Sequence, residues 1–176
     1  MNVRLIVVAA LALAAGVGVY LLDRPPGSAY LLPLSWSLYG SGQRFFGSLG
    51  GSLPSLLHAF CFSILSSLVL PRTIGWAALA CGGWGLLETL LEVGQHPSLA
   101  PILATLIGDR FQQIPVLDHL GPYFNHGVFD PVDVVFGLCG AAFAFIVVCR
   151  VMALARRFFK SAQFRLGAIC QSRRPL

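Results

Sequence analysis

Charged residues are scarce in this sequence. Only 11% of the 176 residues are charged, whereas 56% are hydrophobic. A soluble domain of ordinary composition carries about 25% charged residues. This shortage argues against a soluble globular domain and indicates a membrane protein.

The motifs of many enzyme classes are also missing. The five cysteines contain no CxxC pair, which argues against a zinc site or a disulfide framework, and we expect them to pack as small apolar side chains. Neither a nucleotide-binding loop nor an HExxH motif is present. The sequence therefore identifies no cofactor, and it leaves open whether a metal is bound.

Long apolar stretches are what the sequence does contain. There are four, at about Leu5–Leu22, Leu53–Leu70, Ile74–Val93 and Val132–Val151. Each is long enough, at about 18–20 residues, to cross the hydrocarbon core as a helix. Helices are required because lipid offers no hydrogen-bond partners to the backbone. We predict an all-α membrane protein, a four-transmembrane-helix bundle.

The first stretch has a second interpretation. Arg4 precedes an apolar core that contains several alanines, and this pattern resembles a signal peptide. Its length favours an uncleaved signal anchor over a cleaved leader. Whether it is cleaved stays open.

The basic residues predict the orientation. Arg24, Arg44 and Arg110 fall on one side of the predicted membrane. Nine fall on the other: Arg4, Arg72, Arg150, Arg156, Arg157, Lys160, Arg165, Arg173 and Arg174. Because cytoplasmic segments are enriched in Lys and Arg, both termini are predicted to be cytoplasmic, in a bacterial cytoplasmic membrane. A basic tail after a span is attracted to anionic lipid, and no nucleic-acid recognition motif accompanies it.

These features divide the chain into three regions. Residues 1–52 hold the first span and an outer loop, residues 53–152 form a three-span core, and residues 153–176 form a basic cytoplasmic tail. The core includes a long outer loop, 94–131. Within that loop Ser98–Ile107 is apolar but too short to span, which predicts an interfacial or re-entrant helix.

Ionisable residues gather at a single membrane face. Because consecutive spans run in opposite directions, the start of the second span, the end of the third and the start of the fourth meet at one depth. Ionisable groups near hydrocarbon are costly and commonly functional. The primary candidate site residues are His58, Glu92, Gln95 and Asp133, and the secondary ones are Glu88 and Asp130.

Several roles fit this group. Glu88, Glu92 and Gln95 follow the spacing i, i+4, i+7 and share one helix face. Carboxylates beside a histidine can perform acid–base chemistry, bind a cation or relay protons. Alternatively, hydrogen bonds among His58, Glu92 and Asp133 hold the bundle together.

Other polar residues have simpler explanations. Asp130 precedes a proline and is placed to cap the fourth helix. His96, His119 and His126 show no regular ligand spacing, so we expect ordinary loop histidines, with an external metal site as the alternative.

Small residues predict which spans pack together. Span four contains Gly137-xxx-Ala141 and Gly140-xxx-Ala144, and span three contains several glycines between residues 82 and 85. Small residues at this spacing let helices approach closely. Spans three and four are therefore expected to be neighbours, which would bring Glu92 toward Asp133.

Three short motifs resemble those of the VanZ-like family of small bacterial membrane proteins. The motifs are Leu56-Leu57-His58-Ala59-Phe60, Glu92-Val93-Gly94-Gln95, and Phe129-Asp130-Pro131-Val132-Asp133 followed by Gly137 and Gly140. The resemblance covers about residues 53–150. It implies a four-helix envelope protein, of a family whose name-giving member is associated with teicoplanin resistance. Gly137 stands where the family often has Asn, and Arg110 is the candidate for the family's arginine.

Three functions are consistent with these observations. The first is a VanZ-like protein that acts at the outer leaflet on membrane lipid or a lipid-linked cell-wall intermediate. The second is a small proton-coupled transporter that uses Glu88 and Glu92. The third is a non-catalytic partner or scaffold subunit in the membrane. The sequence names no protein partner and leaves open whether the protein is an enzyme.

Overall fold

A computed structural model describes residues 3–25, 33–40, 44–111, 113–114 and 117–172 of the chain. For residues 34, 108, 109 and 156–172 it describes the backbone and not the side chain. The basic side chains predicted to anchor the tail after residue 155 lie outside the described residues.

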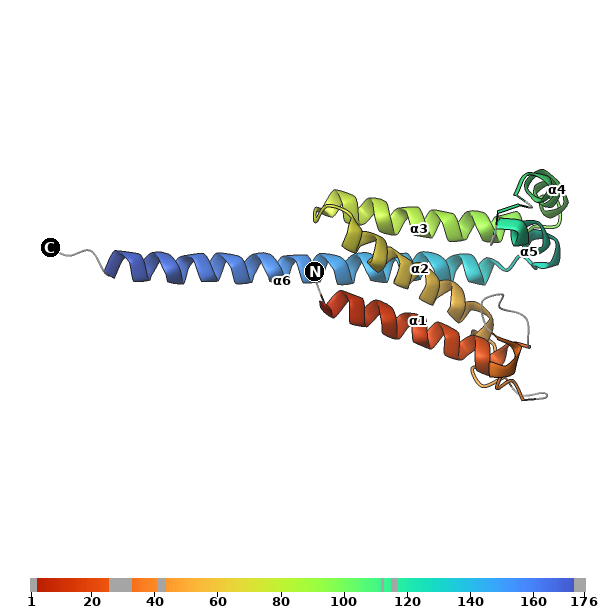
Figure 1. Cartoon of the computed structure of the whole chain (residues 1–176), viewed down its shortest axis with the longest axis horizontal. Helices are drawn as coiled ribbons and strands as arrows, with labels where there is room; N and C mark the ends of the chain where they lie inside the picture. Colours follow the sequence, from red (N-terminus) through yellow and green to blue (C-terminus); the bar gives the residue numbers. More distant parts are fainter. Residues whose placement is uncertain (1–2, 26–32, 41–43, 112, 115–116, 173–176) are drawn as a thin grey trace.

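The described chain is helical (Figure 1). Four long helices are α1 (Val3–Asp23), α2 (Leu49–Val69), α3 (Ile74–Gly94) and α6 (Pro131–Ser172). Each contains a stretch long and apolar enough to cross a membrane, and in α6 this stretch is Pro131–Ala155. The prediction of an all-α membrane protein with four spans is confirmed. Short helices between them are α4 (Ala100–Phe111) and α5 (Leu120–His126), with 3-10 turns at Leu34–Trp36 and Leu117–His119.

Two helix boundaries differ from the prediction. α2 begins at Leu49 rather than at about Leu53, although glycine is a weak helix former and two glycines fall in its first turn. In this first turn the Arg24 guanidinium donates to the Gly51 carbonyl oxygen at 2.8 Å, which ties the start of α2 to the end of α1. α6 continues to Ser172, so most of the predicted tail is a helical extension.

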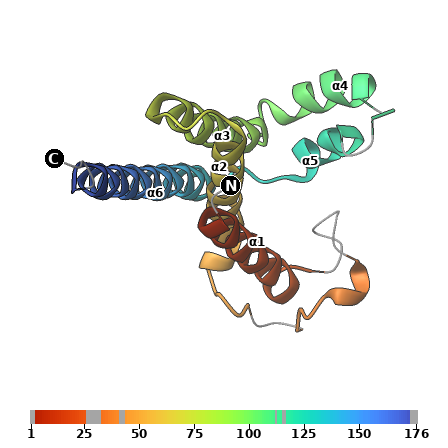
Figure 2. The same ribbon diagram turned by 60° about the vertical axis from the view of Figure 1, so that its left-hand side comes forward.

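α2 is the central helix of the bundle. It packs against α1, α3 and α6, and α3 also packs against α6 (Figure 2). Spans three and four are therefore neighbours, as their small residues predicted. The N-terminus of α1, the α2–α3 connection and the extension of α6 lie at one end of the bundle, the terminal end. α4, α5 and the 3-10 turn at Leu34–Trp36 lie at the other, the loop end (Figure 1).

The apolar core fills the terminal end. It consists mainly of small buried side chains from all four spans: Leu5, Ala9, Ala12, Cys61, Ile64, Ala77, Cys81, Ala144 and Val148. Small side chains let helix backbones approach closely, which gains dispersion contacts where lipid removes the hydrophobic driving force. A Cβ at Gly140 would collide with the backbone of Leu56, so α6 and α2 are in direct backbone contact there.

A second, smaller core holds α4 and α5 at the loop end. Buried Ala100, Ala104 and Phe124 form it, and a Cβ at Gly94 would meet the Phe124 ring. Figures 1 and 2 show α4 running across the end of the bundle rather than along it. A short helix is present where the sequence predicted one, and α5 is brought over the end of α3.

Candidate functional site

The last turn of α3 is connected to the start of α6 through Glu92. This side chain is 8% exposed, and its Oε1 accepts the backbone N–H of Asp130 at 2.8 Å. Its Oε2 faces the amide nitrogen of Gln95 at 3.4 Å, and the same amide donates to the Tyr123 hydroxyl at 2.6 Å. Glu92 and Gln95 therefore fix the positions of α5 and of the connection into α6.

Asp130 has a structural role at the start of α6. Its Oδ1 accepts the backbone N–H of Val132 at 2.8 Å, and Pro131 occupies the first helical position. This is the N-cap arrangement, which satisfies an amide that has no partner within the helix. The capping interpretation is therefore the one that the geometry supports.

Glu88 lies one turn below Glu92 and packs directly against α6. A Cβ at Gly137 would lie 3.1 Å from the Glu88 Cβ, so the glycine makes room for this side chain. Among the described residues the Glu88 carboxylate has no hydrogen-bond partner. Glu88, a secondary candidate in the sequence, therefore contributes less than Glu92 to holding the helices together.

Asp133 also has an unsatisfied oxygen. It stands in the first turn of α6, and the hydroxyl of buried Ser52 on α2 is its hydrogen-bonding neighbour. Its Oδ1 is buried and has no hydrogen-bond partner within the described part of the chain. Buried polar atoms are nearly always paired in native proteins, so this atom calls for a ligand or water.

His58 lies between aromatic rings. It stacks on Tyr20 of α1, with ring centroids 6.0 Å apart, and its ring lies 6.1 Å from that of Phe62. No hydrogen bond joins His58, Glu92 and Asp133 to one another in the described residues. The predicted set of bonds among these three is therefore not what holds the helices together.

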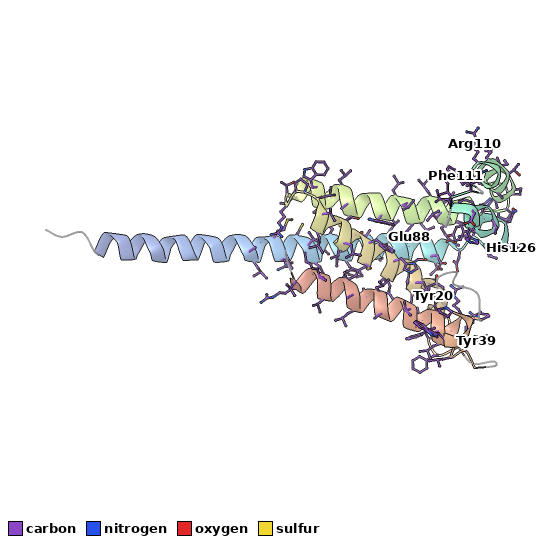
Figure 3. The ribbon with its side chains drawn as sticks, in the orientation of Figure 1. Tyr20, Tyr39, Glu88, Arg110, Phe111 and His126 are labelled. Carbon is purple, nitrogen blue, oxygen red and sulfur yellow. The ribbon has the colours of Figure 1, made fainter. Side chains whose placement is uncertain are left out.

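One cavity collects these side chains. It has a volume of about 710 Å³, within the range of small-molecule sites, and residues from α1, α2, α3, α5 and α6 line it. Five of the six predicted site residues lie on its wall, and Asp130 does not: His58, Glu88, Glu92, Gln95 and Asp133. The cavity belongs to the loop-end half of the bundle, where Tyr20 and His126 are labelled in Figure 3.

Three further cavity residues were not predicted as site residues from the sequence: Tyr20, Arg24 and Tyr123. The Arg24 guanidinium lies 5.9 Å from the centre of the Tyr20 ring. Their i, i+4 spacing at the end of the first span was the available signal, because such residues share a helix face. Arg110, the candidate for the family's arginine, is instead on α4 and points away from the bundle (Figure 3).

Tyr123 is held as a neutral hydroxyl. Burial raises the pKa of its hydroxyl above the usual value, and the charges of Glu92 and Glu88 act in the same direction. The phenol therefore stays protonated at ordinary pH, and its oxygen accepts the Gln95 amide. Nothing in the chain around residue 123 suggested this position, which depends on how α5 folds back.

A small recess lies beside the cavity and shares Arg24 and Gly51 with it. Its volume is about 120 Å³, and Tyr39 and Arg44 also line it. The Asp23 carboxylate, on the same wall, accepts the backbone N–H groups of Phe45 and Phe46 at 2.6 and 2.9 Å. Asp23 therefore anchors the chain before α2.

The loop histidines are spread over different surroundings. His96 accepts the Ser98 N–H and packs on the ring of Phe129, His119 is 3.4 Å from Asp118, and His126 lines the cavity. In the described residues no three His, Cys, Asp or Glu side chains converge closely enough to hold a metal ion.

Comparison of the chain with models of protein families, with curated proteins and with solved structures finds no match. The site must therefore be interpreted from its own geometry.

Proposed function

We propose that this chain is a multi-pass protein of the bacterial cytoplasmic membrane that binds the polar head of an outer-leaflet lipid or lipid-linked envelope intermediate. The observation that carries the proposal is the 710 Å³ cavity, with three carboxylates and one guanidinium on its wall. The core at the terminal end of the bundle consists of small apolar side chains.

The depth of the cavity suits a lipid head. Glu88 is six residues before the end of α3, or about 9 Å along the helix. Asp133 is in the first turn of α6. Both carboxylates therefore lie within about two helical turns of the loop end, which the distribution of basic residues assigns to the outer face. A headgroup entering from that leaflet would reach them without crossing the membrane centre.

The closed terminal end argues against the transporter alternative. Small apolar side chains from all four spans form the core of that half, and no Asp, Glu, His, Lys or Arg belongs to this core in the described part of the chain. A carrier is expected to bind its cargo near the midplane and to open toward both sides. The cavity instead ends within the loop-end half.

The free carboxylates argue against a purely structural role. Glu92 is engaged by Gln95 and by the Asp130 backbone, so it contributes to the bundle. Glu88 makes no hydrogen bond in the described residues, and one oxygen of Asp133 has none. Charged groups that stabilise no contact are expensive beside hydrocarbon and are retained mainly for function.

The motif resemblance to the VanZ-like family supports an envelope role and suggests the phenotype to measure. Four of the residues that carry the resemblance line the cavity: His58, Glu92, Gln95 and Asp133. We therefore expect loss of the protein to change susceptibility to glycopeptides such as teicoplanin.

Complementation of a deletion strain tests the proposal. Glu88→Gln and Asp133→Asn keep the side-chain shape and remove the charge, so we expect normal membrane abundance and loss of the susceptibility phenotype. Asp118→Asn, outside the cavity, is the matched control and should complement fully. Full complementation by the Glu88→Gln, Asp133→Asn double variant would reject a charged binding site.

Glu92→Gln separates structure from charge. Its amide oxygen can still accept the Asp130 N–H, but its NH₂ would face the NH₂ of Gln95. We expect lost activity with membrane abundance at least half of normal, since interhelical hydrogen bonds in membranes contribute about 1 kcal/mol each. Loss of the protein from the membrane would assign Glu92 to bundle stability alone.

A further inference from the structure

The charged residues on the cavity wall come from different helices. Arg24, at the end of α1, lies 5.9 Å from the centre of the Tyr20 ring. Glu88 and Glu92 line the wall from α3, and Asp133 lines it from the first turn of α6. The wall therefore has a cationic side at α1 and an anionic side formed by α3 and α6.

The small recess extends the cationic side. Arg44 lies on its wall with Arg24, so two guanidinium groups border a space beside the main cavity. The one carboxylate there, Asp23, already accepts two backbone N–H groups. Guanidinium groups match the geometry of phosphate oxygens and bind them with paired hydrogen bonds.

The anionic side offers acceptors without donors. The Glu88 carboxylate forms no hydrogen bond among the described residues. The buried Oδ1 atom of Asp133 has no hydrogen-bond donor there either. A primary ammonium presents three N–H donors and a positive charge, and it would satisfy both carboxylates.

From this juxtaposition, and resting on the proposed function above, we propose that the ligand head is a zwitterion with a primary ammonium and a phosphate. The ammonium binds between Glu88 and Asp133, and the phosphate binds at Arg24 toward the recess. The chemical class is an aminophospholipid with an ethanolamine-type head. An anionic head without an ammonium would be repelled by the three carboxylates and should bind more weakly. A head with a quaternary ammonium should also bind more weakly, because it lacks the N–H donors that the Asp133 oxygen requires.

Competition binding measures this specificity. Purified full-length protein in detergent micelles is loaded with a phosphatidylethanolamine that carries a fluorophore on its acyl chain. Unlabelled phosphatidylethanolamine should displace it at least tenfold more effectively than phosphatidylcholine or phosphatidylglycerol. Soluble phosphoethanolamine should compete at least a hundredfold less well, because it lacks the acyl chains that the outer leaflet supplies.

Variants assign the two ends of the head. The Glu88→Gln, Asp133→Asn double variant should weaken phosphatidylethanolamine binding at least tenfold and leave phosphatidylglycerol binding unchanged or stronger. Arg24→Gln should weaken the binding of both lipids. Matched controls are Asp118→Asn and Arg110→Gln, which lie outside the cavity and should change neither. If the double variant does not fold, Glu88→Gln alone provides the test, because this carboxylate holds no hydrogen bond in the described chain.

The outcomes separate this inference from the proposed function. Equal or tighter binding of phosphatidylglycerol, or a preference for phosphatidylethanolamine that survives the carboxylate substitutions, would overturn the zwitterion and leave a lipid-binding cavity intact. Equal competition by soluble phosphoethanolamine would overturn the inference that the ligand is a lipid. If no lipid binds and the cavity variants also complement the deletion strain, both proposals fail.

Discussion

A single methyl group at Gly140 should force the two most intimately packed spans apart. The Cβ of an alanine there would collide with the Leu56 carbonyl oxygen and lie 3.0 and 3.1 Å from the Leu56 C and Cα atoms. Ordinary carbon contacts are about 3.5–4.0 Å. Because the obstacle is backbone and cannot rotate away, α6 must shift from α2 along their shared length.

Gly83 provides the matched control. It lies within α3, and a Cβ there would meet nothing within 4 Å. Both glycine-to-alanine changes gain the same helix propensity, about 1 kcal/mol, so the difference between the variants isolates the steric term. Overpacking of a close contact costs about 1–3 kcal/mol. Gly140→Ala should therefore melt roughly 2–12 °C below Gly83→Ala in detergent.

Gly137→Ala adds an intermediate case. Its Cβ would lie 3.1 Å from the Cβ of Glu88, a side chain that can move. We expect the melting temperatures to follow the order Gly83→Ala, Gly137→Ala, Gly140→Ala, from highest to lowest, by circular dichroism on purified protein. Equal melting of Gly140→Ala and Gly83→Ala would refute direct backbone contact between α2 and α6.

Two further predictions concern the loop end and the orientation. Asp23→Asn leaves one acceptor oxygen for two backbone N–H groups, and a lost hydrogen bond to a charged group costs about 1.5–3 kcal/mol. Limited proteolysis should therefore cut residues 33–48 faster than in an Asp118→Asn control. An unchanged rate of cleavage would contradict the anchoring role. The orientation is tested in a chain whose five native cysteines are replaced by alanine. In intact cells, a single cysteine introduced at Ser98 should react with a membrane-impermeant thiol reagent, and one introduced at Ser172 should not. Labelling at position 172 would reverse the predicted topology.

The spans and the approximate site could be predicted because each depends on local composition. Apolar stretches of sufficient length fold as helices in lipid whatever their neighbours, and alternating direction brings the ends of consecutive spans to the same depth. His58, Glu88, Glu92 and Asp133 could thus be assigned to one region before their contacts were known. The neighbouring positions of spans three and four followed from their small residues.

Rotation and crossing of the helices could not be predicted in the same way. From the sequence, Arg24 served only to predict the orientation, because its contact with Gly51 depends on how α1 crosses α2. Tyr123 enters the cavity only because α5 folds back over α3.

The sequence by itself determined four apolar helices and the clustering of their ionisable residues toward one end. Hydrophobicity is a property of each local stretch, and the order of the spans along the chain fixes the alternating direction of the helices. The tertiary structure alone decided the division of roles within that cluster. Asp130 and Glu92 bond to backbone N–H groups, whereas on the cavity wall Glu88 forms no hydrogen bond in the described chain and Asp133 keeps one oxygen without a donor. Side chains of one chemical type acquire different roles because hydrogen-bond partners are assigned by the packing of segments distant in the chain, which no local pattern records.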